Sequence, residues 1–360
     1  MTQIATRPTE NYYASNRLPS YAVGILLAVA FVLSWGAFSF LRPEGAEEGV
    51  NLPLVGVVTA LVFGLLQYLT SLIVEGSRRA IDRTVTLMVV LAFVLAMIPL
   101  LSLLYTVVSL GAERFDYDFF NYSMRNVVGE GGGAAHAMAG TFIMTALATL
   151  ISVPVGLLTS IYLVEYGSGN RLARSITFFV DVMTGIPSIV AGLFAYSLFS
   201  LILGPGTRVG IAGAAALSVL MIPIVVRSSE EMLRLVPNEL REASYALGVP
   251  KWLTIVKVVL PTALAGITTG VMLAIARVMG ETAPLLIAAG FSNNFNFNPF
   301  SDRMQSLPNF VYYSYVAQGS VPEAYLDRAW AGALTLILIV MALNLGARLI
   351  TNIFAPKYGR

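Results

Sequence analysis

The chain has 360 residues, of which 57% are apolar and only 12% are charged. A soluble domain has about 25% charged residues, so this chain has too little polar surface for a soluble globular protein. A net charge of +2 without long Lys/Arg runs argues against a nucleic-acid partner. The absence of cysteine excludes disulfides and thiolate-held metals, and a single histidine makes a histidine-based metal site improbable.

Eight apolar stretches are long enough to cross a bilayer, whose core of roughly 30 Å takes about 20 residues of helix. They lie at about residues 21–41, 52–74, 84–110, 137–163, 175–203, 210–226, 260–289 and 329–353. The first follows a polar tail and lacks a small-residue cleavage site, so we expect it to remain in the mature chain. The chain is therefore predicted to be an all-α, polytopic membrane protein with about eight transmembrane helices.

The orientation follows from the distribution of basic residues, because loops rich in Lys and Arg stay in the cytoplasm. With both termini inside, the cytoplasmic segments hold 15 Lys and Arg and the external segments hold six. We therefore expect a multi-pass protein of the cytoplasmic (plasma or inner) membrane with both termini cytoplasmic.

Two predicted external loops, residues 111–136 and 290–328, are rich in aromatic residues and asparagine. They could receive a binding protein. An equally good interpretation places their tyrosines in an aromatic belt at headgroup level; these are Tyr312, Tyr313 and Tyr315. His136, which follows a run of glycines, is expected to be an exposed loop residue without a role.

The longest predicted cytoplasmic segment, residues 227–258, carries helix signals. Ser228 with Glu231 fits a capping box. A second short helix is expected at residues 238–247, and Gly248 would end it in a left-handed conformation. The polar residues of this helix are left for solvent or a partner; they are Glu239, Arg241 and Glu242.

The same segment resembles the EAA loop of ABC importer permeases. The matching residues, at the family's spacing, are Glu242-Ala243-Ser244, Gly248 and Val258-Val259-Leu260-Pro261. Ser244 and Val258 replace an Ala and an Ile of the family pattern. The resemblance implies that this loop docks on a cytoplasmic ATPase and transmits its motion, with Glu242, Ala243, Gly248, Leu260 and Pro261 as the coupling residues. The alternative is an interfacial amphipathic helix.

A phosphate-binding GxxxxGK[ST] loop is missing from the sequence. We therefore expect no cofactor and no catalytic site in this chain, with ATP and Mg²⁺ bound by a partner ATPase.

Charged residues also fall inside the predicted span 260–289. Arg277 and Glu281 are four residues apart, on one face of a continuous helix. They are expected either to neutralise each other for insertion or to form an anion site, because a guanidinium suits a tetrahedral oxyanion. Asp181, near the cytoplasmic end of its span, is expected to be satisfied by water or a cytoplasmic arginine.

The run from Ala276 to Leu286, ARVMGETAPLL, is similar to a stretch of the PstA family of phosphate ABC importer permeases. The resemblance covers about residues 84–360 and includes IPSIVAG at 186–192. It implies a six-helix permease domain and a role in the phosphate path for Arg277, Gly280, Glu281 and Thr282. Residues 1–83 would be an extension with two further transmembrane helices.

The resemblance also implies a set of partners. These are a second, PstC-like permease, two PstB-like ATPase subunits and an extracytoplasmic PstS-like phosphate-binding protein. The alternatives are an importer of another oxyanion and an ion-coupled secondary transporter, although the spans contain only two carboxylates, Asp181 and Glu281. A membrane-embedded enzyme lacks support because the sequence contains no catalytic set such as HExxH.

Overall fold

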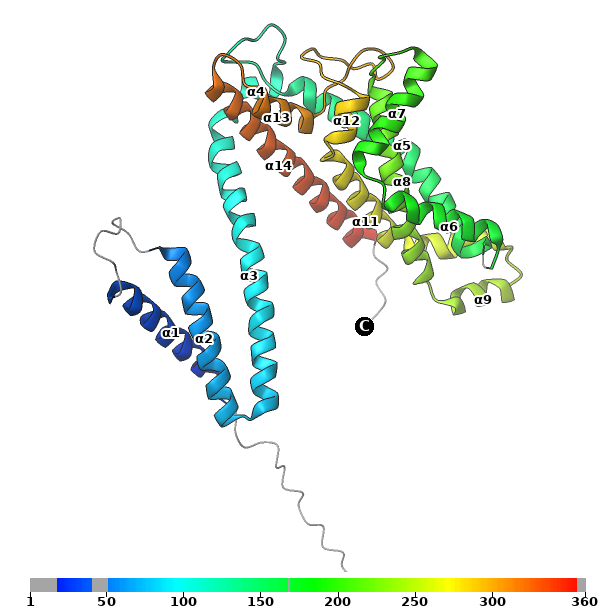
Figure 1. The fold of residues 1–360 in the computed structure, drawn as a ribbon. Helices are drawn as coiled ribbons and strands as arrows, with labels where there is room; N and C mark the ends of the chain where they lie inside the picture. Colours follow the sequence, from blue (N-terminus) through cyan, green and yellow to red (C-terminus); the bar gives the residue numbers. More distant parts are fainter. Residues whose placement is uncertain (1–17, 41–50, 168, 355–360) are drawn as a thin grey trace, which may run out of the picture. The chain divides into compact units, whose positions relative to one another are not determined.

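A computed structural model describes residues 18–40, 51–167 and 169–354, and all regular secondary structure in these ranges is helical (Figure 1). The α-helices are α1 Ser20–Phe40, α2 Leu52–Val74, α3 Ser77–Gly111, α4 Tyr117–Asn121, α5 Ala135–Ile161, α6 Arg171–Thr184, α7 Ser188–Leu203, α8 Gly210–Arg234, α9 Asn238–Ala246, α10 Lys251–Thr254, α11 Leu260–Met279, α12 Ala283–Ala288, α13 Leu307–Val316 and α14 Pro322–Phe354. A 3₁₀ turn, η1, lies at Ala112–Arg114, and two π-helical turns, η2 and η3, lie at Tyr162–Tyr166 and Ile255–Val259.

Seven of the described helical segments are long and apolar enough to cross a membrane, or eight if a bent pair counts as one span. This agrees with the predicted number. The predicted span 175–203 is not one straight helix, because the chain bends by 108° between α6 and α7. Gly185 and Pro187 lie in the break, where proline cannot donate a backbone hydrogen bond and disfavours helical geometry in the residue before it.

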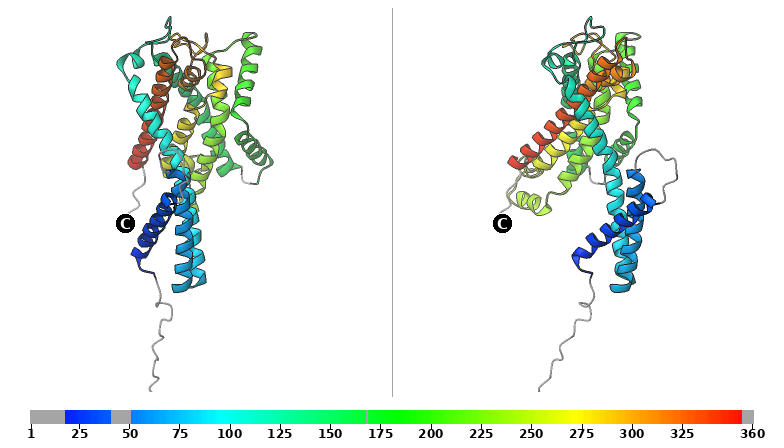
Figure 2. Two further views of the ribbon diagram at one scale, coloured as in Figure 1. Left: turned by 60° about the vertical axis from the view of Figure 1, so that its left-hand side comes forward. Right: turned by 90° about the vertical axis from the view of Figure 1, so that its left-hand side faces the viewer.

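The chain divides into two compact units, Met1–Leu104 and Tyr105–Arg360. In the first unit α1 packs against α2, and both helices are drawn in blue in Figure 2. Most apolar side chains of this unit are exposed, as expected where lipid is the solvent. The proposed boundary between an extension and a permease domain at residues 83 and 84 remains a prediction; it falls inside α3.

Glu75, between α2 and α3, ties the first unit together. Its carboxylate accepts hydrogen bonds from Leu18 N (2.8 Å), Ser71 Oγ (2.8 Å) and Arg83 Nη2 (2.8 Å). Burial by itself would raise the pKa of Glu75, but these donors hold the pKa below its ordinary value. The Glu75 carboxyl group is therefore ionised at neutral pH, and the stability that its contacts contribute is lost as the pH falls through that lowered pKa.

Helix α8 is the core of the second unit. It packs along α5 in the most extensive helix pair of the described residues and also contacts α6, α7, α11 and α12. Small residues permit this close packing. A Cβ added at Gly156 of α5 would lie 2.6 Å from a side-chain carbon of Val225, and one at Gly213 would lie 2.8 Å from the sulfur of Met144. The apolar side chains buried around α8 therefore set the positions of its neighbours.

Candidate functional site

The predicted span 260–289 is broken at the run proposed for the substrate path. Helix α11 ends at Met279 and α12 begins at Ala283, so Gly280, Glu281 and Thr282 form a non-helical link. The last backbone bonds of α11 are made by Gly280 N to Arg277 O (3.4 Å) and Glu281 N to Val278 O (3.2 Å). Pro284 in the first turn of α12 fits a new helix start, because its missing N–H is not needed there.

Arg277 and Glu281 therefore do not share a helical face, and the expected i,i+4 pair is wrong. Among the residues that the structure describes, neither side chain forms an ion pair. Arg277 is exposed on the last turn of α11, whereas Glu281 is half-buried in the link. An exposed, permanently charged guanidinium on an apolar helix is free to bind an anion or a neighbouring subunit.

Asn309 of α13 contacts the end of the link and the start of α12, and it was not singled out from the sequence. The residue is fully buried, and its amide is satisfied when the oxygen faces Leu286 N (3.0 Å) and the nitrogen faces Thr282 O (3.0 Å). Leu286 N also donates to Thr282 O (3.0 Å), so the buried amide shares the first backbone hydrogen bond of α12 and ties α13 to the start of that helix. No short motif marks Asn309, because its partners lie more than 20 residues away in the chain.

Helix α7 approaches the start of α12 very closely. A Cβ added at Gly192 would lie 2.6 Å from Pro284 Cα and 2.9 Å from Pro284 O, so only glycine fits against this backbone. The residues that carried the family resemblance in α7 and α12 are thus brought into direct contact. The same packing places the 280–282 link beside α7.

Thr282 lines a cavity of about 290 Å³ that is walled mainly by α13 and α14. Its aromatic lining residues are Tyr312, Tyr315 and Trp330. Arg277, Gly280 and Glu281 do not line this cavity, so the structure does not bring the four predicted path residues together in one cavity.

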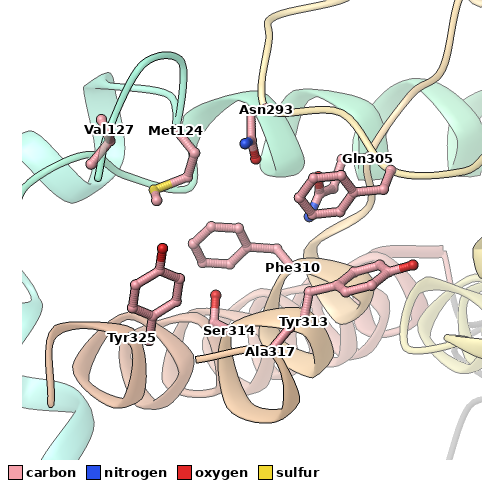
Figure 3. Close-up of a pocket in the computed structure, with 10 residues that line it drawn as sticks. Met124, Val127, Asn293, Gln305, Phe310, Tyr313, Ser314, Ala317 and Tyr325 are labelled. Carbon is pink, nitrogen blue, oxygen red and sulfur yellow. The ribbon is translucent and has the colours of Figure 1, made fainter. Parts of the chain in front are cut away.

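A second cavity, of about 190 Å³, lies at the end of the unit that carries α13 (Figure 3). Met124 and Asn293 come from two loops on one side of it, and Ser314 and Tyr325 come from α13 and α14 on the other. Gln305 is buried, accepts from Ser292 N (3.1 Å) through Oε1, and leaves Nε2 without a partner in the described structure. This cavity therefore offers aromatic walls and one free buried donor.

Tyr313 lines this cavity, and His136, close to it, differs from expectation. Tyr313 packs on Phe291 with ring centroids 4.6 Å apart, whereas Tyr312 and Tyr315 are exposed. His136 is not an exposed loop residue: it lies in the first turn of α5, is 2% exposed and packs edge-on against Phe310.

At the opposite end of the unit, α9 and α10 form a hairpin, residues 238–254 (Figure 1). Gly248 has a φ of +76°, its N–H donates to Tyr245 O (2.9 Å), and Val249 N donates to Ser244 O (3.2 Å). These bonds, with Gly248 in a left-handed conformation, form the usual glycine C-cap at the end of α9. The helix and its end agree with the sequence-based expectation.

Two of the other proposed coupling residues lie in this hairpin, and two follow it in the chain. Glu242 and Ala243 are exposed on α9, and Leu260 and Pro261 begin α11 directly after η3. The capping box proposed for Ser228 and Glu231 is wrong, because α8 continues without a break to Arg234. A large apolar surface remains uncovered on and next to the hairpin: Leu235 is 72% exposed, Leu247 83% and Trp252 61%.

Arg241 also departs from expectation, because it does not face solvent. Its side chain is 12% exposed and pairs with Glu165 of η2 at 2.8 Å. This contact joins residues 76 positions apart, which sequence spacing cannot predict. Asp181 is satisfied as expected: it pairs with Arg227 of α8, which also binds Glu230.

Comparison with known proteins agrees with these features. A family model for the binding-protein-dependent transport system inner membrane component matches residues 152–360. Phosphate transport system permease protein PstA 1 of Mycobacterium tuberculosis (strain CDC 1551 / Oshkosh) is 47% identical over 277 residues, covering 76% of this chain and 89% of the relative. PstA of Yersinia pestis is 37% identical over 283 residues, covering 79% and 93%.

A solved structure shares the fold. It is a chain of a bacterial alginate ABC transporter in complex with an alginate pentasaccharide-bound periplasmic protein, with a TM-score of 0.55 and 14% identity, covering 75% of this chain and 96% of that chain. The identity is too low to carry more than architecture. From the family match, the two relatives and the membrane-spanning helices together, the chain belongs to the PstA family of phosphate transport system permeases, membrane permease subunits of ABC importers.

Proposed function

We propose that this permease carries phosphate and that Arg277 contacts it on the way through the membrane. The observation that supports this most is the exposed Arg277 guanidinium beside the 280–282 link, on a helix that is otherwise uncharged; it has no ion pair within the part of the chain that the structure describes. A guanidinium binds a phosphate dianion through two parallel hydrogen bonds and keeps its charge at any physiological pH. The names of the PstA relatives point to the same substrate.

Such a substrate needs driven uptake. Moving a dianion toward a negative interior costs about 4.6 kcal/mol per 100 mV before any concentration gradient is considered. Since this chain has no phosphate-cradling loop for ATP, ATP and Mg²⁺ would be bound by a partner ATPase. The hairpin, with exposed Glu242, Ala243 and Leu247, is the proposed surface on which that ATPase docks.

The complete transporter would contain a second, PstC-like permease, two PstB-like ATPase subunits and an external PstS-like phosphate-binding protein. The exposed Arg277 face of α11 would then line the path between the two permeases. Solubilised from its native membrane under mild conditions, the chain should co-purify with an ATPase and a second permease. Recovery of the intact chain as a stable, transport-active protein without an ATPase would favour an ion-coupled transporter and contradict the proposal.

Gly248 provides a test of the docking surface. Gly248→Val should strain the left-handed turn by about 1–2 kcal/mol and displace α9, so that less ATPase remains bound. Gly248→Asn is the matched control, because asparagine tolerates this conformation far better than a β-branched residue. ATPase retained per permease is measured after purification. Equal retention in both variants would remove Gly248 from the coupling residues.

The proposed orientation, with both termini and the hairpin cytoplasmic, is tested by labelling. Ser301 and Glu231 are exposed and lie on opposite sides of the membrane in this orientation. Because the chain has no cysteine, Ser301→Cys and Glu231→Cys each create a single reactive thiol. A membrane-impermeant maleimide added to intact cells should label only the Ser301→Cys protein. Labelling of only the Glu231→Cys protein would reverse the orientation.

A further inference from the structure

Glu165 is a buried carboxylate at the hairpin end of the second unit. It lies in η2, the π-helical turn that continues α5, and its side chain is 5% exposed. Arg241 of α9 donates to Glu165 Oε1 from Nη2 (2.8 Å) and from Nε (3.1 Å). A buried carboxylate depends on such a partner, because the charge is poorly compensated once the partner is removed.

Further contacts gather both helices of the hairpin at this point. Arg241 also donates to the carbonyl oxygens of Leu233 (3.0 Å) and Val236 (2.6 Å), at the end of α8. Lys251 of α10 donates to the backbone oxygen of Glu165 and lies 4.9 Å from the ring centroid of Tyr166. The hairpin is therefore held against η2 from both of its helices.

The hairpin is also internally tied. The hydroxyls of Ser244 in α9 and Thr254 in α10 share a buried hydrogen bond of 2.8 Å. The chain leaves the hairpin through η3, a second π-helical turn, and such turns are frequent at functional sites. A force on α9 would thus move α9 and α10 together.

Helix α5 leads from η2 to the cavity of Figure 3 at the other end of the unit. There, Leu307 N donates to Thr141 Oγ1 (2.7 Å), and a Cβ added at Gly140 would lie 2.1 Å from Gln305 O. Gln305 lines that cavity. The same helix therefore carries tight contacts to the hairpin at one end and to the cavity at the other.

We propose that the Glu165–Arg241 ion pair transmits a displacement of the hairpin to α5 and, along α5, to the cavity lined by Gln305. Glu165 and Arg241 are both positioning residues. The proposal rests on the proposed function, because a partner ATPase supplies the displacement of the hairpin. Coupling of this kind is carried by packed elements that have two arrangements. In the two arrangements here, α5 would occupy two different positions, and Gln305 would be displaced between them.

The test uses a thiol reporter in the cavity, in the complete transporter with its ATPase. Asn293 lines the cavity and is exposed, so Asn293→Cys gives the only thiol of this chain. Its labelling rate with a maleimide is compared without nucleotide and after trapping with ATP and vanadate. In this reference background the rate should depend on nucleotide. Adding Glu165→Gln, which keeps the shape but removes the charge, should reduce that dependence about tenfold while ATP is still hydrolysed.

The controls separate this role from a general loss of structure. Glu231→Gln removes an exposed acid of α8 and should leave the nucleotide dependence unchanged. Arg241→Gln should match Glu165→Gln, and the double variant should be no worse than either, because residues that act as one unit are not additive. If Glu165→Gln fails to assemble, Arg241→Lys keeps the charge and should lose part of the dependence.

The proposal is overturned if the labelling rate of Glu165→Gln depends on nucleotide as strongly as that of the reference. It is also overturned if the effects of Glu165→Gln and Arg241→Gln multiply in the double variant, or if the labelling rate of the reference complex does not depend on nucleotide. The labelling is read without phosphate. A complex that responds to nucleotide as expected but imports no phosphate would therefore contradict the assigned substrate and leave the coupling role of Glu165 intact.

Discussion

Arg277→Gln is expected to lower phosphate uptake by about 30-fold or more, since removing the charged partner of a bound ion costs about 2–5 kcal/mol. The transporter should still assemble, because Arg277 is exposed and has no ion pair within the described residues. Arg277→Lys keeps the charge but loses the planar fork, so it should fall between the wild type and Arg277→Gln.

The measurement is uptake of labelled phosphate, normalised to the amount of assembled complex. Arg348→Gln is the matched control, because Arg348 is an exposed arginine on the long helix α14. It should retain uptake close to that of the wild type. Wild-type uptake by Arg277→Gln would make Arg277 a structural residue and remove the main physical argument for an anionic substrate.

Gly192→Ala is expected to destabilise the permease by about 1–3 kcal/mol, the usual cost of overpacking a tight contact. The added Cβ would meet backbone atoms of Pro284 at 2.6 and 2.9 Å, and backbone cannot move aside as a side chain can. To relieve the clash, α7 and α12 must separate, which would also shift the 280–282 link. Uptake per folded transporter should therefore fall along with stability.

Gly346→Ala is the matched control, because nothing lies within 4 Å of a Cβ added there. In a helix interior with open space, alanine is favoured over glycine by about 1 kcal/mol, so this variant should be unchanged or slightly more stable. The measurement compares the thermal unfolding midpoints of the purified Gly192→Ala and Gly346→Ala proteins. Equal midpoints would mean that α7 and α12 are not in the close contact described.

The membrane spans and the hairpin could be predicted because their signals are local. Apolar stretches of sufficient length identify spans regardless of packing. The end of α9 follows from Gly248, whose positive φ is a property of a single residue. The family's motif added the coupling interpretation and the importer class, and the comparisons confirm the class.

The breaks within spans could not be predicted as firmly. Gly280 and Pro284 are tolerated inside transmembrane helices, so their presence did not separate a kink from a full interruption. A continuous helix would place Arg277 and Glu281 on one face, and the interruption removes that arrangement. Asn309 contacts the start of α12 just after the interruption, and that contact is set by tertiary packing alone.

The contacts of Glu165 and His136 were also out of reach. Glu165 pairs with Arg241 across 76 residues of chain, and a single sequence contains no signal for such a distant pair. The glycines before His136 suggested an exposed loop, whereas the structure places its ring against Phe310 in a packed cluster. Burial of a single polar residue depends on how the loops fold over it.

Phosphate transport through Arg277 is tested most directly by ATP hydrolysis of the complete transporter in liposomes, with its binding protein and with phosphate added or withheld. Phosphate should stimulate hydrolysis, sulfate at the same concentration should not, and Arg277→Gln should remove the stimulation while basal hydrolysis remains. Stimulation by sulfate but not by phosphate, or stimulation by phosphate that is unchanged in Arg277→Gln, would contradict phosphate transport through Arg277.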